Sequence, residues 1–98
     1  MQEQLEDMLD EIGIPTHFKG YQYWIDMIIL AYNDNPNNYS HNMEYLYAKV
    51  SKKYNTSRDC IERCCRYAKN FSKLNIKSCK SFLAELVKMY KRRYKNEI

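Results

Sequence analysis

The 98-residue sequence contains two glycines, two prolines and no long hydrophobic run. Scarce glycine and proline argue against a sheet-rich fold with many tight turns and favour helices joined by short loops. No apolar run approaches the roughly 20 residues that a membrane-spanning helix needs, and the N-terminus lacks the basic and apolar segments of a signal peptide. We therefore expect one all-α, cytoplasmic domain without membrane association.

The sequence also lacks the motifs of the common enzyme classes. It has no glycine-rich phosphate loop, no nucleophile elbow and no paired-carboxylate motif. Its two histidines, His17 and His41, are far apart and have no partner at a recognisable spacing. We expect neither enzymatic activity nor a cofactor.

Positive charge is almost missing from the first half of the chain. Of the 16 Lys and Arg residues, Lys19 alone precedes Lys49, whereas the first eleven residues are rich in acids. The formal net charge of +4 is therefore concentrated in the second half, where a polyanion such as nucleic acid would bind. A solvated basic face that only keeps the protein soluble would have the same charge pattern.

Apolar residues recur at helical spacing in five segments separated by turn residues. Glycine and proline signal helix ends, and Ser or Thr signals helix starts. The expected helices cover about 5–12 (ended by Gly13), 21–32 (ended before Pro36), 43–54 (capped by Ser40), 58–71 (capped by Thr56 or Ser57) and 82–94. These segments predict a compact bundle of about five helices with the second helix in its core.

The third and fourth expected helices are joined by a tight turn, as a helix-turn-helix requires. Ser51 is small enough for a close helix crossing, Asn55 tolerates left-handed backbone, and Ile61 can fill the wedge between the helices. We expect a helix-turn-helix over about residues 41–71 within a single domain, 1–98. A helical hairpin with a polar turn would show the same pattern.

One face of the fourth expected helix is rich in hydrogen-bonding side chains. Glu62, Arg63 and Arg66 have the chemistry to read base edges, because arginine matches guanine bidentately and glutamate accepts from cytosine. Expected phosphate contacts are Lys49, Lys52, Lys53, Ser57, Arg58 and Lys69. Alternatively, the face is simply exposed and Glu62 and Arg66 form an ordinary i, i+4 pair.

The stretch "NTSRDCIERCCRYAKN", residues 55–70, carries three of the four cysteines. Cys60 and Cys64 share a helix face, but two further ligands for a zinc site are missing, so we expect no metal. Small packing residues are the favoured interpretation. Redox sensing by Cys60 or Cys65, beside arginines that lower a thiol pKa, is the remaining one.

Three motifs together resemble a known family. They are Ile-Gly-Ile-Pro-x-His-x-Lys-Gly-Tyr from Ile12, Lys-Lys-Tyr-Asn-Thr from Lys52, and Ile-Glu-Arg-x-x-Arg from Ile61. Over roughly residues 5–80 the sequence resembles the C-terminal DNA-binding domain of the master response regulator of sporulation initiation in endospore-forming Firmicutes.

The resemblance implies an all-helical effector domain of a transcription regulator, acting at the bacterial nucleoid. It would bind short promoter boxes in double-stranded DNA, with tandem copies forming a homodimer there. The family's base-contacting glutamate and two arginines match Glu62, Arg63 and Arg66. Contacts with RNA polymerase or another protein are implied by the family's segment before the last helix, which is shorter here, around residues 77–81.

Other departures leave an alternative open. The family's full-length members carry a phosphorylatable receiver domain before this region, and we expect none in this chain. The sequence also has ten tyrosines, a residue enriched at protein interfaces. The alternative is a standalone protein-interaction module or antagonist that has lost or does not use DNA binding. A mobile element is one source of such a protein.

Overall fold

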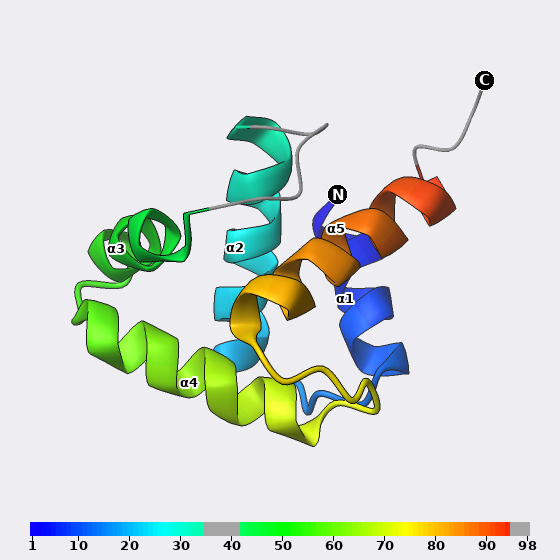
Figure 1. Ribbon diagram of the computed structural model, residues 1–98, viewed down its shortest axis with the longest axis horizontal. Helices are drawn as coiled ribbons and strands as arrows, with labels where there is room; N and C mark the ends of the chain where they lie inside the picture. The colour runs from blue at the N-terminus through cyan, green and yellow to red at the C-terminus, as the bar shows by residue number, and fades with distance from the viewer. Residues whose placement is uncertain (35–41, 95–98) are drawn as a thin grey trace.

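The computed structural model of the protein describes residues 1–34 and 42–94 (Figure 1). Its helices are α1 (Gln2–Glu11), α2 (Lys19–Asp34), α3 (Met43–Lys53), α4 (Arg58–Phe71) and α5 (Cys79–Tyr94). The described residues contain no strand, so the prediction of an all-α bundle of about five helices is confirmed. In those residues no helix is both long enough and apolar enough to cross a membrane.

Helix α2 is the centre of the bundle, as its apolar stripe predicted. It packs against each of the other four helices. Burying such a stripe is the main driving force for packing a helix of this kind. Its completely buried side chains are Trp24, Ile25, Met27, Ile28 and Ala31.

The helix ends follow local signals where the structure describes them. Gly13 has φ +92°, the left-handed conformation expected directly after α1. The signals predicted at Pro36 and Ser40 lie outside the described residues. Asn42, rather than Ser40, is the N-cap of α3, and its side-chain oxygen accepts a hydrogen bond from the Tyr45 N–H at 3.2 Å.

Helix α5 closes the core on the side of α1 and α2 (Figure 1). Phe82, Leu83 and Leu86 on its inner face are completely buried. At its C-terminal end, Tyr90 donates a hydrogen bond to Gln4 at 3.1 Å, and Arg93 pairs with Glu11 at 2.7 Å. These contacts join the two ends of the described chain, and α5 also packs against α4.

Candidate nucleic-acid interface

The connection between α3 and α4 is a tight turn. Asn55 adopts φ +53°, the left-handed conformation that its sequence position predicted. The Thr56 N–H donates to the Ser51 carbonyl at 3.0 Å, which reverses the chain. Ser57 then caps α4, because its Oγ accepts from the Cys60 N–H at 3.0 Å. The chain thus leaves α3 at Lys53 and enters α4 at Arg58.

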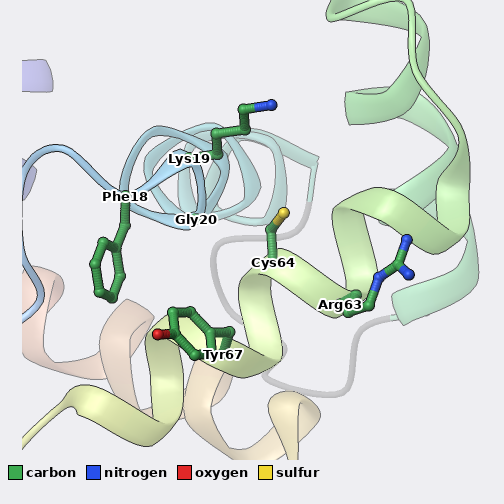
Figure 2. Close-up of a pocket in the computed structure, with 6 residues that line it drawn as sticks. All are labelled: Phe18, Lys19, Gly20, Arg63, Cys64 and Tyr67. Carbon is green, nitrogen blue, oxygen red and sulfur yellow. The ribbon is translucent and has the colours of Figure 1, made fainter.

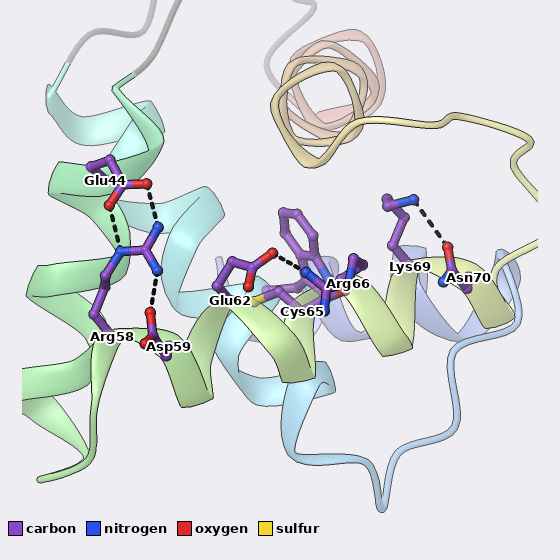
Figure 3. A network of polar contacts seen from close by, with 9 residues as sticks. Glu44, Arg58, Asp59, Glu62, Cys65, Arg66, Lys69 and Asn70 are labelled. Atoms are coloured by element: carbon purple, nitrogen blue, oxygen red, sulfur yellow. Dashed lines mark hydrogen bonds and ion pairs between the residues drawn. The ribbon is translucent and has the colours of Figure 1, made fainter.

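The inner side of the α3–α4 joint is packed as predicted. Val50 and Ile61 are almost or completely buried, and Ser51 is 8% exposed. On the outer side, Arg58 at the start of α4 connects the two helices, because its guanidinium pairs with Glu44 on α3 and with the neighbouring Asp59 (Figure 3). The hydrogen bond from Arg58 lowers the pKa of the Glu44 carboxyl.

Helix α2 fixes α4 against the core through two contacts. A Cβ built on Gly20 would lie 2.4 Å from the Cys64 carbonyl oxygen and 2.7 Å from the Ala68 Cβ, so only glycine allows this approach. One turn further on, the Trp24 indole N–H donates to the Cys65 carbonyl at 2.8 Å. Helical spacing gave no sign of the Trp24 hydrogen bond or of the role of Gly20, although a glycine inside a helix signals close packing.

The three residues predicted to read bases lie together on the outer face of α4. Glu62 and Arg66 form the i, i+4 ion pair that the alternative interpretation anticipated (Figure 3). Their side chains are 27% and 52% exposed. Arg63 is exposed and makes no hydrogen bond or ion pair within the described part of the chain. The face therefore presents one unpaired guanidinium beside a preorganised Glu–Arg pair.

The predicted phosphate contacts have different surroundings. Lys49 and Lys52 are exposed, and Ser57 is exposed at the start of α4. The Lys53 side chain is 60% exposed, and its Nζ lies 3.0 Å from the Oδ1 of Asp26 on α2. Asp26 itself is nearly buried and also accepts a hydrogen bond from Tyr54. These groups lie along the last part of α3 and directly before α4: Lys49, Lys52, Lys53 and Ser57.

The predicted exposure of Lys69 is wrong. Its side chain is buried, with the residue 4% exposed, and its Nζ donates to the Asn70 side chain at 3.0 Å (Figure 3). The same Nζ donates to the Ile76 carbonyl at 3.1 Å. The connector between α4 and α5 folds back over this lysine. A buried ammonium with two protein acceptors stabilises the connector and is not available at the outer surface to contact phosphate.

Phe71 continues the apolar spacing of α4 but is not buried. It is 49% exposed and Tyr67 is 58% exposed. Their rings form an aromatic cluster with Phe18, with centroid separations of 4.9 Å to 5.3 Å. The cluster lies where the start of α2 meets the second half of α4, and helical spacing on α4 gave no sign of the Phe18 contribution.

The four cysteines are free thiols in unlike environments. Cys65 is completely buried, and burial raises the pKa of its thiol, which removes it from the redox hypothesis. Cys60 and Cys64 are partly exposed. Within residues 1–34 and 42–94, no three His, Cys, Asp or Glu side chains are grouped to hold a metal ion.

The comparison with protein families covers nearly the whole chain. The family model described as sporulation initiation factor Spo0A C terminal matches residues 5–98. The match extends beyond the roughly 5–80 covered by the sequence motifs and includes α5. It contains all of α3, the turn and α4, with the exposed Glu62, Arg63 and Arg66 face.

Proposed function

The chain belongs to the family of Spo0A C-terminal domains, the DNA-binding effector domains of sporulation regulators, and from that premise we propose that it binds double-stranded DNA sequence-specifically. Helix α3, the turn and α4 act as the helix-turn-helix of a single domain, 1–98. The observation that carries the proposal is the exposed face of α4, where Arg63 is unpaired and Glu62 is fixed by Arg66. Such a helix face is suited to the major groove.

The division of labour follows from the surroundings of each side chain. Arg63 and Arg66 donate to guanine, and Glu62, held by Arg66 through one oxygen, accepts from a cytosine amino group. Lys49, Lys52, Lys53 and the Ser57 hydroxyl contact phosphates and set the register. Arg58 is engaged by two carboxylates and Lys69 is buried, so neither is assigned to phosphate.

Family membership makes the biological setting transcription control in sporulation. We place its action on DNA in the bacterial cytoplasm, at the nucleoid, as a regulator rather than an enzyme. Tandem binding as a homodimer and contacts with RNA polymerase or another protein are extensions of this proposal. A protein-interaction module or antagonist that does not use DNA remains the second candidate, favoured by the exposed aromatic cluster of Phe18, Tyr67 and Phe71.

The test begins with selection of bound duplexes from a randomised pool by the purified chain. Fluorescence anisotropy then compares the selected duplex with a scrambled one over a salt series. We expect a preference of about a thousandfold or more with a steep salt dependence. Equal affinity for both duplexes would leave only a basic surface, and no binding would favour the protein-interaction module.

A further inference from the structure

Asp26 on α2 is a nearly buried carboxylate beside two lysines that are proposed to contact DNA. The residue is 7% exposed and lines a pocket of about 230 Å³ between α2 and α3. The other residues that line this pocket are Ile29, Leu30, Lys49, Val50 and Lys53. A negative charge at this place repels a polyanion and is costly to bury. An uncharged side chain would avoid both costs.

The two oxygens of the Asp26 carboxylate have different donors. The Lys53 Nζ lies 3.0 Å from Oδ1, and the Tyr54 hydroxyl donates to Oδ2. The Lys53 ammonium also lies over the Tyr54 ring, 5.5 Å from its centroid. The Tyr54 ring in turn packs against Tyr23 on α2, with 4.9 Å between the centroids. The last residue of α3 and the residue after it are therefore both held to α2, directly before the turn into α4.

This arrangement restrains Lys53 without removing it from solvent. The Lys53 side chain is 60% exposed, whereas the Asp26 side chain is 9% exposed. One N–H of the ammonium is directed at Asp26, and the other two remain available to an acceptor outside the protein. The pair has no net charge, so Lys53 attracts distant phosphates less strongly than an unpaired lysine does.

Tyr54 alone does not require a carboxylate. An amide oxygen accepts a hydrogen bond from a tyrosine hydroxyl without the cost of burying a charge. The Lys53 ammonium is the partner that gains from a full negative charge. A partly exposed ion pair contributes little to stability, because solvent screens it. The charge of Asp26 therefore acts mainly on where Lys53 lies.

Lys19, beside the proposed base-reading Arg63, lacks such a restraint. A groove of about 330 Å³ lies between the start of α2 and α4 (Figure 2). It is lined by Phe18, Lys19, Gly20, Arg63, Cys64 and Tyr67, none of which is acidic. Lys19 is exposed and forms no ion pair within the described residues. No protein carboxylate thus limits the phosphates that Lys19 can reach, in contrast to Lys53.

We propose that Asp26 is a positioning residue that holds Lys53 for phosphate contact in the specific complex and withholds it from non-specific DNA, an inference that rests on the proposed function. When α4 lies in its correct register, a phosphate meets the fixed ammonium. In other registers the phosphates lie elsewhere, and Asp26 prevents Lys53 from following them. Asp26 thereby raises the ratio of specific to non-specific affinity.

Asp26→Asn is the first test, because it keeps the shape of the side chain and an acceptor for Tyr54 but removes the charge that holds Lys53. Anisotropy over a salt series compares the selected and scrambled duplexes. At about 0.1 M salt we expect affinity for the scrambled duplex to rise about three- to tenfold, with a steeper salt dependence. Affinity for the selected duplex should rise less, so that the preference falls about threefold or more.

The opposite results have a clear meaning. A purely structural role for Asp26 predicts weaker binding to both duplexes, and unchanged or weaker binding to the scrambled duplex would overturn the proposal. An equal gain on both duplexes would also overturn it, since Asp26 would then act only through net charge. Asp7→Asn, which removes the same charge from the exposed surface of α1, is the control and should change either affinity less than about twofold.

A charge-neutral double variant provides an independent test. Asp26→Asn combined with Lys53→Met removes both charges and leaves the net charge unchanged. Affinity for the scrambled duplex should stay within about twofold, while affinity for the selected duplex should fall at least about fivefold, because only the specific complex uses Lys53. The matched control is Glu85→Gln with Arg92→Met, which removes an ion pair on α5 and should change neither affinity.

Urea unfolding of each variant first establishes that it is folded. Equal losses of the double variant on both duplexes, or no loss on the selected one, would overturn the proposal. Absence of a preference in the unaltered protein would instead refute the proposed function. A preference that is unchanged in both Asp26 variants would refute only the role of Asp26.

Discussion

The Trp24 indole N–H lies 2.8 Å from the Cys65 carbonyl oxygen and connects the central helix α2 to the middle of α4. Both residues are completely buried. The contact lies on the inner side of α4, opposite the residues proposed to read DNA. The position of that outer face is therefore set from within the core.

Replacing Trp24 with Phe should destabilise the fold by about 2–4 kcal/mol, because it removes a buried hydrogen bond and leaves a cavity. The free energy of unfolding from urea titration provides the measurement. Tyr45→Phe, at an exposed position on α3, is the control and should change stability by less than about 0.5 kcal/mol. A Trp24→Phe effect as small as that of the control would show that the contact does not hold α4.

Gly20→Ala should destabilise the protein, although alanine ordinarily stabilises a helix relative to glycine by up to about 1 kcal/mol. The added Cβ meets backbone at 2.4 Å, so α2 and α4 must move apart, at a cost of about 1–3 kcal/mol. Thermal and urea unfolding measure the sign. A more stable variant would mean that α4 approaches α2 less closely than described.

Asn55 allows a paired test of the turn. Asn55→Gly should be neutral or slightly stabilising, because glycine adopts positive φ without strain. Asn55→Val should cost about 1–2 kcal/mol, since a β-branched residue is strained in that conformation. Equal stability of the two variants, measured by urea unfolding, would argue that the left-handed turn is absent in solution.

Arg63→Ala should reduce affinity for the selected duplex by about 1–3 kcal/mol and relax specificity. Lys52→Ala should weaken binding to the selected and scrambled duplexes alike. It should also make the slope of log affinity against log salt concentration shallower by about one. Lys88→Ala, which removes the same charge from the exposed surface of α5, is the matched control and should do neither. Anisotropy on both duplexes distinguishes these outcomes, and equal losses for Arg63→Ala on both would remove Arg63 from base reading.

The Glu44–Arg58 ion pair should contribute to stability in a pH-dependent way. The folded-state pKa of Glu44 is lowered from 4.5 by its hydrogen bond from Arg58. Its contribution is therefore present above pH 4.5 and is lost as the pH falls through the lower folded-state value. The stability difference between the protein and Glu44→Gln should shrink to nothing on acidification. A difference that persists with Glu44 protonated would assign the effect to packing.

The local sequence was sufficient for the helices, the turn and the outer face of α4. Apolar spacing located the five helices, and Asn55 marked the turn. The cap of α4 was predicted at Thr56 or Ser57, and the structure has it at Ser57, because capping depends on neighbouring residues. The same spacing placed Arg63 and Arg66 outside. The Glu62–Arg66 pair also follows from i, i+4 geometry alone.

Contacts between segments that are distant in the sequence could not be predicted from local sequence patterns. The polar residues around it on α4 predicted that Lys69 is exposed. In the structure the connector to α5 covers Lys69, and the Ile76 carbonyl accepts its hydrogen bond. Phe71 follows the apolar spacing of α4 yet lies half exposed in a cluster with Phe18. Helical periodicity describes one helix, whereas burial depends on which other segment packs over each side of it.

The sequence by itself determined an all-α chain, the α3–α4 turn and a polar face bearing Glu62, Arg63 and Arg66, since these depend on residues a few positions apart. Only the tertiary structure decided how α2 holds α4 and what lies beside that face. Gly20 approaches the Cys64 backbone across more than forty residues of chain, and the groove that Lys19 and Cys64 both line exists because α2 and α4 pack there. The environment of Cys64 is consequently a property of the folded protein.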